Sequence, residues 1–390
     1  MRKIRILLWQ KTWIIHLTKL FVLQAVGRVA IKFEKNFGVI SEENQSVDLK
    51  GKKIAVVAMY PDPNPLYLIS MKNLVNGLLA NDHKILAISN KKINESLKNY
   101  LKDQGCTILV RKNRGRDFGA YQAGIQWIER HYGLSNVERI SLVNDTLIWM
   151  EDSTRVVAET MKSEWDSLFL NFEVHTHAQS FFLSFSGAVL SNDRFVRFWR
   201  SYVPLNYRRH TILKGEILLS EVLIKEGFRC KPYVDQSLLM NEAVVVPEDM
   251  LSLSSLGDVV ISQEGGVPMP GVKHGRLIPS TEITALAGFE GITDELEVNA
   301  DSFKGGLLRV LNQYCNSQAP HRIGLHLYVL LGIPMKADIY KCYPLSELTQ
   351  AVKLRNPELH HLFMDFMSGK IQRYMEGSKE NIKRRAISEI

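Results

Sequence analysis

Short hydrophobic runs alternate with longer amphipathic segments between residues 50 and 240. The short runs predict buried strands at residues 54–60, 84–89, 107–110, 139–143 and 167–170, and a strand at 179–190 that returns across the sheet. The longer segments predict helices at residues 66–79, 94–103, 120–131, 153–162, 193–202 and 215–226. Such an alternation predicts an α/β fold, in which helices cover both faces of a mainly parallel sheet.

The two ends of the chain have different patterns. Residues 1–40 carry eight Lys or Arg and one Glu among Trp, Phe and Leu, so +7 of the net charge of +8 lies there. That composition predicts a basic amphipathic helical arm on a membrane surface, and a helix packed on the body or on a partner is the alternative. Residues 41–52 predict a polar linker, residues 241–303 an irregular acidic loop region, and residues 304–390 a helical C-terminal region with helices at 306–314, 322–331 and 357–388.

Composition also excludes several classes of protein. The charge pattern is that of a basic arm on a body of mixed charge and not of a uniformly basic surface, which argues against nucleic acid as a partner. The four cysteines form no C-x-x-C pair, which argues against a zinc ribbon or a disulfide framework and indicates a reducing compartment. No apolar run approaches the ~20 residues that span a bilayer, and no signal-peptide pattern is present.

A charged, glycine-bearing segment follows the strand predicted at 107–110. The guanidinium fork of arginine suits phosphate, and glycine lets the backbone approach a ligand. A solvated charged turn is the alternative, but ligands of parallel sheets bind at the carboxyl ends of strands. We therefore expect the segment to bind a phosphorylated ligand through Arg111, Asn113, Arg114, Gly115, Arg116 and Asp117.

A second polar turn, Asn144-Asp145-Thr146, ends the strand predicted at 139–143. A carboxylate there can hold Mg²⁺ or Mn²⁺ against a diphosphate, because Mg²⁺ uses one or two carboxylates plus phosphate oxygens. An Asx turn is the alternative. Asp145 is the predicted metal ligand, and Asn144 is predicted to contact the substrate.

Two further groups are predicted to reach the same cleft. His177, Gln179 and Ser180 form a polar cluster that suits contact with a donor or an acceptor, with a half-buried structural histidine as the alternative. Glu216 is expected in the first turn of the helix predicted at 215–226, where the helix dipole would stabilise its carboxylate. If Glu216 faces the cleft, it can act as a general base toward a sugar hydroxyl.

These motifs, in this order and spacing, resemble the rhamnan synthesis protein F family over roughly residues 50–240. The resemblance rests on Arg111-x-Asn113-x-Gly115-x-Asp117-Phe-Gly-Ala-Tyr121, Leu142-x-Asn144-Asp145-Thr146, Gln179-Ser180-x-Phe182, and Gly215-Glu216-Ile217 with Gly227-Phe228. It implies a GT-A-like, Rossmann-type fold and a glycosyltransferase that uses a rhamnose-type donor, dTDP-L-rhamnose in most members. The implied acceptor is a polyprenyl-diphosphate-linked glycan at the cytoplasmic face of the membrane, as in O-antigen or rhamnan synthesis.

The resemblance also assigns roles. It implies that Glu216 is the base of an inverting transfer and that Asn144-Asp145-Thr146 takes the place of the D-x-D metal motif, here with a single carboxylate. A transferase with a UDP- or GDP-linked donor, or a non-catalytic scaffold of a polysaccharide assembly complex, is the alternative.

Overall fold

The computed structural model describes residues 22–25, 39–43, 52–161, 166–169, 172–173, 177–233, 324–339 and 345–388. Most of the basic arm, the acidic region at 241–303 and the helix predicted at 306–314 lie outside these ranges. Within them, no helix is both long enough and apolar enough to cross a bilayer.

An eight-stranded sheet forms the centre of the molecule, with the strand order β1-β4-β3-β2-β5-β10-β7-β11. Strands β4, β3, β2 and β5 run parallel to one another, which confirms the prediction of a mainly parallel sheet. Strand β10 runs antiparallel to both β5 and β7, and β11 is parallel to β7. The strands are β1 (Val39–Glu43), β2 (Lys53–Met59), β3 (His83–Ser89), β4 (Thr107–Arg111), β5 (Arg139–Asn144), β7 (Ser167–Phe169), β10 (Phe182–Ser186) and β11 (Cys230–Pro232).

Side chains of the central strand β2 enter two separate cores. Ala55, Val57 and Met59 belong to the core on one face, and Ile54, Val56 and Ala58 belong to the core on the other. Because successive side chains of a strand point to opposite faces, a strand that is apolar throughout must be covered on both. Burial of both faces therefore explains the uninterrupted apolar runs in the sequence.

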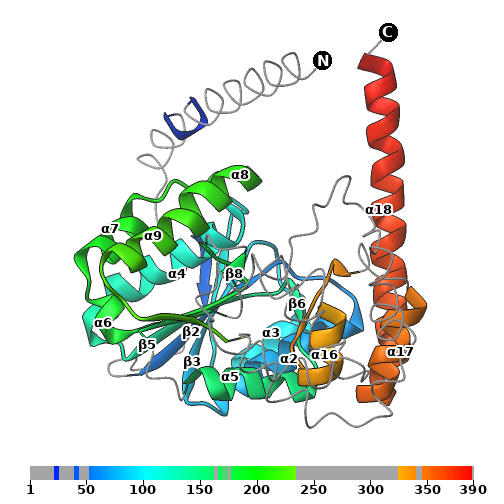
Figure 1. Cartoon of the computed structure of the whole chain (residues 1–390), viewed down its shortest axis with the longest axis horizontal. Coiled ribbons are helices and arrows are strands. Elements are labelled where there is room, and N and C mark those ends of the chain that lie inside the picture. Colours follow the sequence, from blue (N-terminus) through cyan, green and yellow to red (C-terminus); the bar gives the residue numbers. More distant parts are fainter. Residues whose placement is uncertain are drawn as a thin grey trace, which may run out of the picture.

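Helices cover the two faces in two groups (Figure 1). One face carries α2 (Pro65–Leu79), α3 (Glu95–Asp103) and α5 (Thr154–Met161). The other carries α4 (Arg116–Tyr132), α6 (Gly187–Leu190), α7 (Asp193–Ser201) and α9 (Leu218–Lys225). Gly124 lets α4 approach the sheet closely, since a Cβ at this position would lie 2.5 Å from Val56 Cγ1.

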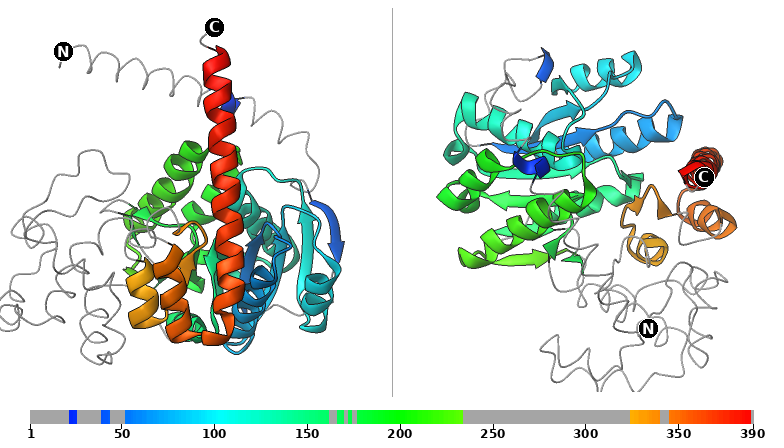
Figure 2. Two further views of the ribbon diagram at one scale, coloured as in Figure 1. Left: turned by 90° about the vertical axis from the view of Figure 1, so that its right-hand side faces the viewer. Right: turned by 90° about the horizontal axis from the view of Figure 1, so that it is seen from above.

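The C-terminal segment packs on the same face as α2. It consists of α16 (Gly324–Leu331), β12 (Met335–Lys336), α17 (Leu345–Arg355), a 3₁₀ turn at Pro357–Leu359 and α18 (His360–Ser388). Phe363 and Met367 of α18 are fully buried in the core that contains α2. Strand β12 pairs antiparallel with β6 (Leu147–Ile148), the strand that follows β5. Helix α18 then continues past the body of the molecule (Figure 2).

Three predicted boundaries are wrong. The linker predicted at 41–52 begins as part of β1, an edge strand whose Ser41 and Glu42 side chains are exposed, so that no hydrophobic pattern marks it. The strand predicted at 179–190 ends at Ser186 and α6 follows, because a short apolar run has the same pattern in a strand and in a buried helix. The helix predicted to begin at Ala120 begins at Arg116.

Candidate functional site

A pocket of about 520 Å³ opens at the carboxyl ends of β2 and β5. Five parts of the chain contribute side chains to it: the loop after β2 with the start of α2, the start of α4, the turn after β5, the region between β9 (His177–Ala178) and α9, and the C-terminal segment. The lining residues include Tyr60, Asp62, Tyr67, Arg116, Asp117, Asn144, Asp145, Thr146, Gln179, Ser180, Phe181, Arg208, Thr211, Glu216, Lys336, Asp338 and Lys370. Two predicted motifs, 111–124 and 144–146, thus meet at one cleft.

The turn after β5 is fixed by backbone hydrogen bonds on both sides. The Asn144 amide donates to the Phe181 carbonyl at 3.2 Å, and the Asp145 amide donates to the Ala58 carbonyl at 3.1 Å. Asn144 Oδ1 accepts from the Thr146 amide at 3.1 Å. The Asx turn, the alternative to a metal site at this position, is therefore present. It does not exclude metal binding, because it holds Asp145 at the pocket.

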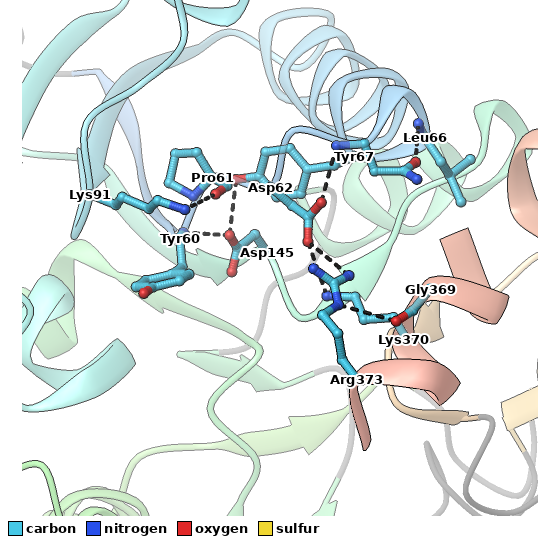
Figure 3. A network of polar contacts seen from close by, with 11 residues as sticks. Tyr60, Pro61, Asp62, Leu66, Tyr67, Lys91, Asp145, Gly369, Lys370 and Arg373 are labelled. Carbon is cyan, nitrogen blue, oxygen red and sulfur yellow. Dashed lines mark hydrogen bonds and ion pairs between the residues drawn. The ribbon is translucent and has the colours of Figure 1, made fainter. Parts of the chain in front are cut away.

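The half-buried Asp145 carboxylate lies beside two tyrosines (Figure 3). Its Oδ2 accepts from the Tyr67 hydroxyl at 2.9 Å and from the Tyr60 amide at 2.5 Å. The pKa of Asp145 is raised to about 6, mainly by burial and in part by the charge of Asp117, while the hydrogen bonds from Tyr60 and Tyr67 act to lower it. Asp145 is thus a desolvated carboxylate that a cation would bind well.

Asp117 lies in the first turn of α4. The chain enters that helix through two consecutive residues in the left-handed region, Gly115 (φ 76°) and Arg116 (φ 54°). Asp117 Oδ2 accepts a hydrogen bond from Asn144 Nδ2 at 2.9 Å. Burial raises the pKa of Asp117, while the charges of Lys336 and Arg116 oppose the shift. The two predicted motifs are therefore in direct contact.

Glu216 lies in a π-helical segment, Thr211–Ile217, that continues α8 (Arg208–His210). The first-turn position expected for it is therefore wrong, because the chain is already helical from Arg208. Glu216 Oε1 accepts from the Ser180 amide at 3.1 Å, and Oε2 lies 3.3 Å from His177 Nε2. The Glu216 side chain is 12% exposed and borders the pocket, where it can reach a bound hydroxyl.

Several predicted site residues do not line the pocket. Arg111 is 3% exposed, and its guanidinium donates to Asn90 Oδ1 at 2.8 Å and to the Arg114 carbonyl at 3.0 Å. Gly115 donates its amide to Asn206 Oδ1 at 2.7 Å, and Asn206 Nδ2 donates to the Asn113 carbonyl. Hydrogen bonds within and around the loop thus involve Arg111, Asn113, Arg114 and Gly115, which do not line the pocket. The pocket is lined by the next two residues, Arg116 and Asp117.

The polar cluster at 177–180 is divided in a similar way. Gln179 and Ser180 line the pocket, whereas His177 does not. The His177 side chain is 4% exposed and contacts Glu216. Ser180 also fixes its neighbours, because its carbonyl accepts from the Tyr121 hydroxyl at 2.7 Å. His177 is therefore placed to orient Glu216 and not to touch a ligand.

Sequence reasoning missed the contributions of the loop after β2 and of the C-terminal segment. Asp62 Oδ2 lies 3.4 Å from Lys370 Nζ and 3.5 Å from Arg373 Nη2, so that α18 is tied to the pocket rim (Figure 3). Burial alone would raise the pKa of Asp62, but the Asn64 amide, Lys370 and Arg373 together lower it. The Pro61-Asp-Pro-Asn-Pro65 stretch signals only a strand end in the sequence, and nothing near Lys336 or Lys370 signals a site.

Asp145 fits a divalent cation as one ligand of a larger set. In the part of the chain that the structure describes, no three His, Cys, Asp or Glu side chains are grouped to hold a metal ion. A carboxylate offers about four lone-pair sites, so two hydrogen bonds to Asp145 leave capacity for a cation. Oxygens from a bound diphosphate and from water would have to complete the coordination.

A pocket at the carboxyl edge of a mainly parallel sheet, lined by carboxylates and lysines, defines a ligand-binding α/β protein. Residues 85–273 match the family model of rhamnan synthesis protein F, which confirms the resemblance seen in the sequence. The match includes the Asp117, Asn144–Thr146 and Glu216 motifs, and it ends before the C-terminal segment.

Two curated proteins are similar to this chain over part of their length. The Sinorhizobium fredii protein y4gN is 30% identical over 159 residues, which are 39% of this chain and 41% of that protein. The virulence protein VirA of Vibrio anguillarum is 24% identical over 144 residues, 36% of this chain and 47% of VirA. The chain thus spans less than half the length of the curated relatives that it matches.

Two solved structures overlap more of the chain. The mannosyltransferase PcManGT from Pyrobaculum calidifontis, in complex with GDP-Man and Mn²⁺, covers 76% of this chain and 97% of its own, with a TM-score of 0.32 and 9% identity. The glycosyltransferase GlyE of Streptococcus pneumoniae covers 48% of this chain and 46% of its own, with a TM-score of 0.29 and 12% identity. Scores at this level carry no argument about chemistry.

Proposed function

We propose that this protein is a GT-A-like glycosyltransferase of polysaccharide synthesis. It transfers a sugar, rhamnose from dTDP-L-rhamnose in our proposal, from a nucleotide sugar to a hydroxyl of a lipid-linked glycan. The observation that carries the proposal is the convergence of Asp117, Asp145 and Glu216 on one pocket at the carboxyl ends of parallel strands. The rhamnan synthesis protein F match and the polysaccharide role that its description names support the choice of reaction.

The donor is held by the wall that Asp117 and Asp145 form. Asp117 and Arg116, at the start of α4, bind the nucleotide and its sugar, with Asn144 fixing the carboxylate of Asp117. Asp145 orients the diphosphate, and it would hold Mg²⁺ or Mn²⁺ if one is bound. The ion would then supply positive charge that stabilises the diphosphate as it leaves.

Glu216 is the general base of an inverting transfer. Its carboxylate takes the proton of the acceptor hydroxyl while the hydroxyl oxygen forms a bond to the anomeric carbon. The bond between that carbon and the diphosphate oxygen breaks, and the electron pair leaves with the nucleoside diphosphate. The Ser180 amide and His177 hold Glu216 in place for this step, as positioned bases require.

The acceptor is proposed to reach the pocket from a membrane. Its polyprenyl-diphosphate carrier would keep it at the cytoplasmic face, where the basic residues 1–40 would bring the enzyme. We propose that the protein is peripheral at that surface.

Ligand binding tests the proposal directly. Thermal shift of the full chain is measured against dTDP-, UDP- and GDP-sugars, with and without Mn²⁺, because a ligand of the native state raises the melting temperature with its concentration. One nucleotide sugar is expected to stabilise the protein, and D117N should abolish the shift while the exposed control D103N keeps it. A full panel without any shift would contradict the proposal and favour a non-catalytic scaffold.

A further inference from the structure

The C-terminal segment places a lysine into the pocket from the far end of the chain. Lys336 belongs to β12, in register with Leu147 of β6. The next residue fixes the same contact, since the Ala337 amide donates to the Thr146 carbonyl at 2.8 Å. Backbone pairing therefore holds Lys336 against the turn that carries Asp145.

The Lys336 ammonium is directed at this turn. Lys336 Nζ donates to Thr146 Oγ1 at 2.9 Å and lies 4.7 Å from the centre of the Phe181 ring. The hydrogen-bond partner is a neutral hydroxyl and the ring is a neutral surface, so neither of them neutralises the ammonium. That charge acts on whatever occupies the pocket beside it.

Charged groups from three other elements surround Lys336. Asp117 of α4, Glu216 of the π-helical segment and Asp338 after β12 attract its charge, and Arg208 of α8 opposes it. Burial has the largest effect and lowers the pKa of Lys336. A desolvated cation gains more from a nearby phosphate than an exposed one does, because water screens it less.

The other cations of the pocket are placed differently. Lys370 is paired with Asp62, and Arg116 and Arg208 are exposed at the rim. Lys336 is also beyond residues 85–273, so the family match gives it no role. Among the described cations, Lys336 is the one whose ammonium hydrogen-bonds within the Asn144–Thr146 turn.

We propose that Lys336 binds the diphosphate of the donor and stabilises the negative charge that grows on it as the sugar is transferred. The inference rests on the proposed function and names a binding residue for its leaving group. A lysine suits this position as a compact point charge that bonds to several phosphate oxygens. The C-terminal segment would then complete the site through Lys336, a residue that lies outside all the motifs recognised in the sequence.

Calorimetric titration of the full chain with nucleoside diphosphates (dTDP, UDP and GDP) and with the corresponding monophosphates tests the proposal. K336M should weaken binding of the preferred diphosphate roughly 10- to 100-fold, the range expected for loss of a hydrogen bond to a charged group. Binding of the monophosphate should change by less than about threefold, which separates a contact with the second phosphate from general damage to the pocket. K353M, an exposed lysine of α17, is the matched control and should bind like the wild type.

A second variant covers the possibility that K336M does not fold. K336Q keeps a donor for Thr146 and removes only the charge, so it should show the same selective loss for the diphosphate. Wild-type affinity for the diphosphate in either folded variant would overturn the role of Lys336 and leave the proposed function standing. A wild-type protein that binds no nucleoside diphosphate would instead overturn the proposed function, and this inference with it.

Discussion

Asn144 donates a hydrogen bond from Nδ2 to Asp117 Oδ2 at 2.9 Å, and this contact joins the end of β5 to the first turn of α4. The two residues are separated by 27 positions in the sequence. The same asparagine accepts from the Thr146 amide through Oδ1, so its side-chain orientation is fixed from both ends. A half-buried carboxylate is thereby held at the pocket with a neutral hydrogen-bond partner and not with an arginine.

Replacing this neutral partner with a second carboxylate should destabilise the protein in a pH-dependent way. N144D places a carboxylate within hydrogen-bond distance of Asp117, and two such groups cannot both ionise at low cost. We expect a loss of about 1–3 kcal/mol in the free energy of unfolding at pH 8, and a smaller loss at pH 5 where the pair can share a proton. Urea denaturation at both pH values measures it. N99D, on the exposed side of α3, is the control, and an equal loss at both pH values would contradict the account.

The D145N variant should be more stable than the wild type at pH 8. The native pKa of Asp145 is about 6, above its ordinary value of 3.8, so the native state binds the proton more tightly than the unfolded state does. Stability from this group is present below pH ~4 and is lost as the pH rises through 6. Asparagine removes the cost, and its carbonyl can still accept from Tyr60 and Tyr67.

We expect the free energy of unfolding of D145N to exceed that of the wild type by on the order of 1–3 kcal/mol at pH 8 and by little at pH 4. Thermal unfolding at the two pH values checks this, with D103N as an exposed control that should show no such difference. A lower melting temperature for D145N at pH 8 would show that the carboxylate stabilises the fold. A gain in stability combined with a loss of transfer would mark Asp145 as a residue kept for function.

The contact between Asp62 and α18 should make a small but measurable contribution to stability. Lys370 and Arg373 are partly exposed, at 29% and 57%, so solvent screens both ion pairs. A double-mutant cycle of D62N with K370M should give a coupling of about 0.5–1 kcal/mol that falls at high salt. No coupling at low salt would contradict a stabilising role for the Asp62–Lys370 ion pair.

The basic arm gives a prediction that is independent of the pocket. Deletion of residues 1–37 should release the protein from vesicles that contain anionic lipid, because most of the net positive charge is removed with the arm. Co-sedimentation with anionic and with purely zwitterionic vesicles measures the effect. Continued sedimentation of the shortened protein with anionic vesicles would contradict membrane contact by the arm.

The parallel sheet and half of the pocket could be predicted from the sequence. Uninterrupted apolar runs such as Ile54–Met59 require burial on both faces, and the carboxyl ends of parallel strands must share one edge. Asp117 follows β4 and Asn144 ends β5, so this rule places both residues at one edge of the sheet. Because β3 and β2 lie between the two strands, the rule does not predict that the two residues touch. Their hydrogen bond needed the structure, because it depends on the turn geometry at Gly115 and Arg116.

The other half of the pocket could not be predicted. Lys336 contacts Thr146 across 190 positions, and Lys370 contacts Asp62 across 308. Hydrophobic periodicity shows that α18 is amphipathic but not which helix it packs against. The position of Arg111 could not be predicted for a different reason, since the sequence pattern of an arginine at a phosphate site is also that of an arginine buried with Asn90 and a carbonyl as its partners.

The central claim, a glycosyl transfer in which Glu216 is the base, is tested most directly by E216Q. Glutamine keeps the shape and the hydrogen bond from the Ser180 amide, but it cannot take a proton. With the donor that the thermal-shift panel identifies, and a lipid-linked acceptor, single-turnover transfer by E216Q should fall roughly 10²- to 10⁴-fold while donor affinity changes little. E221Q, an exposed glutamate of α9, should transfer at the wild-type rate. Transfer by E216Q at the wild-type rate would contradict the account.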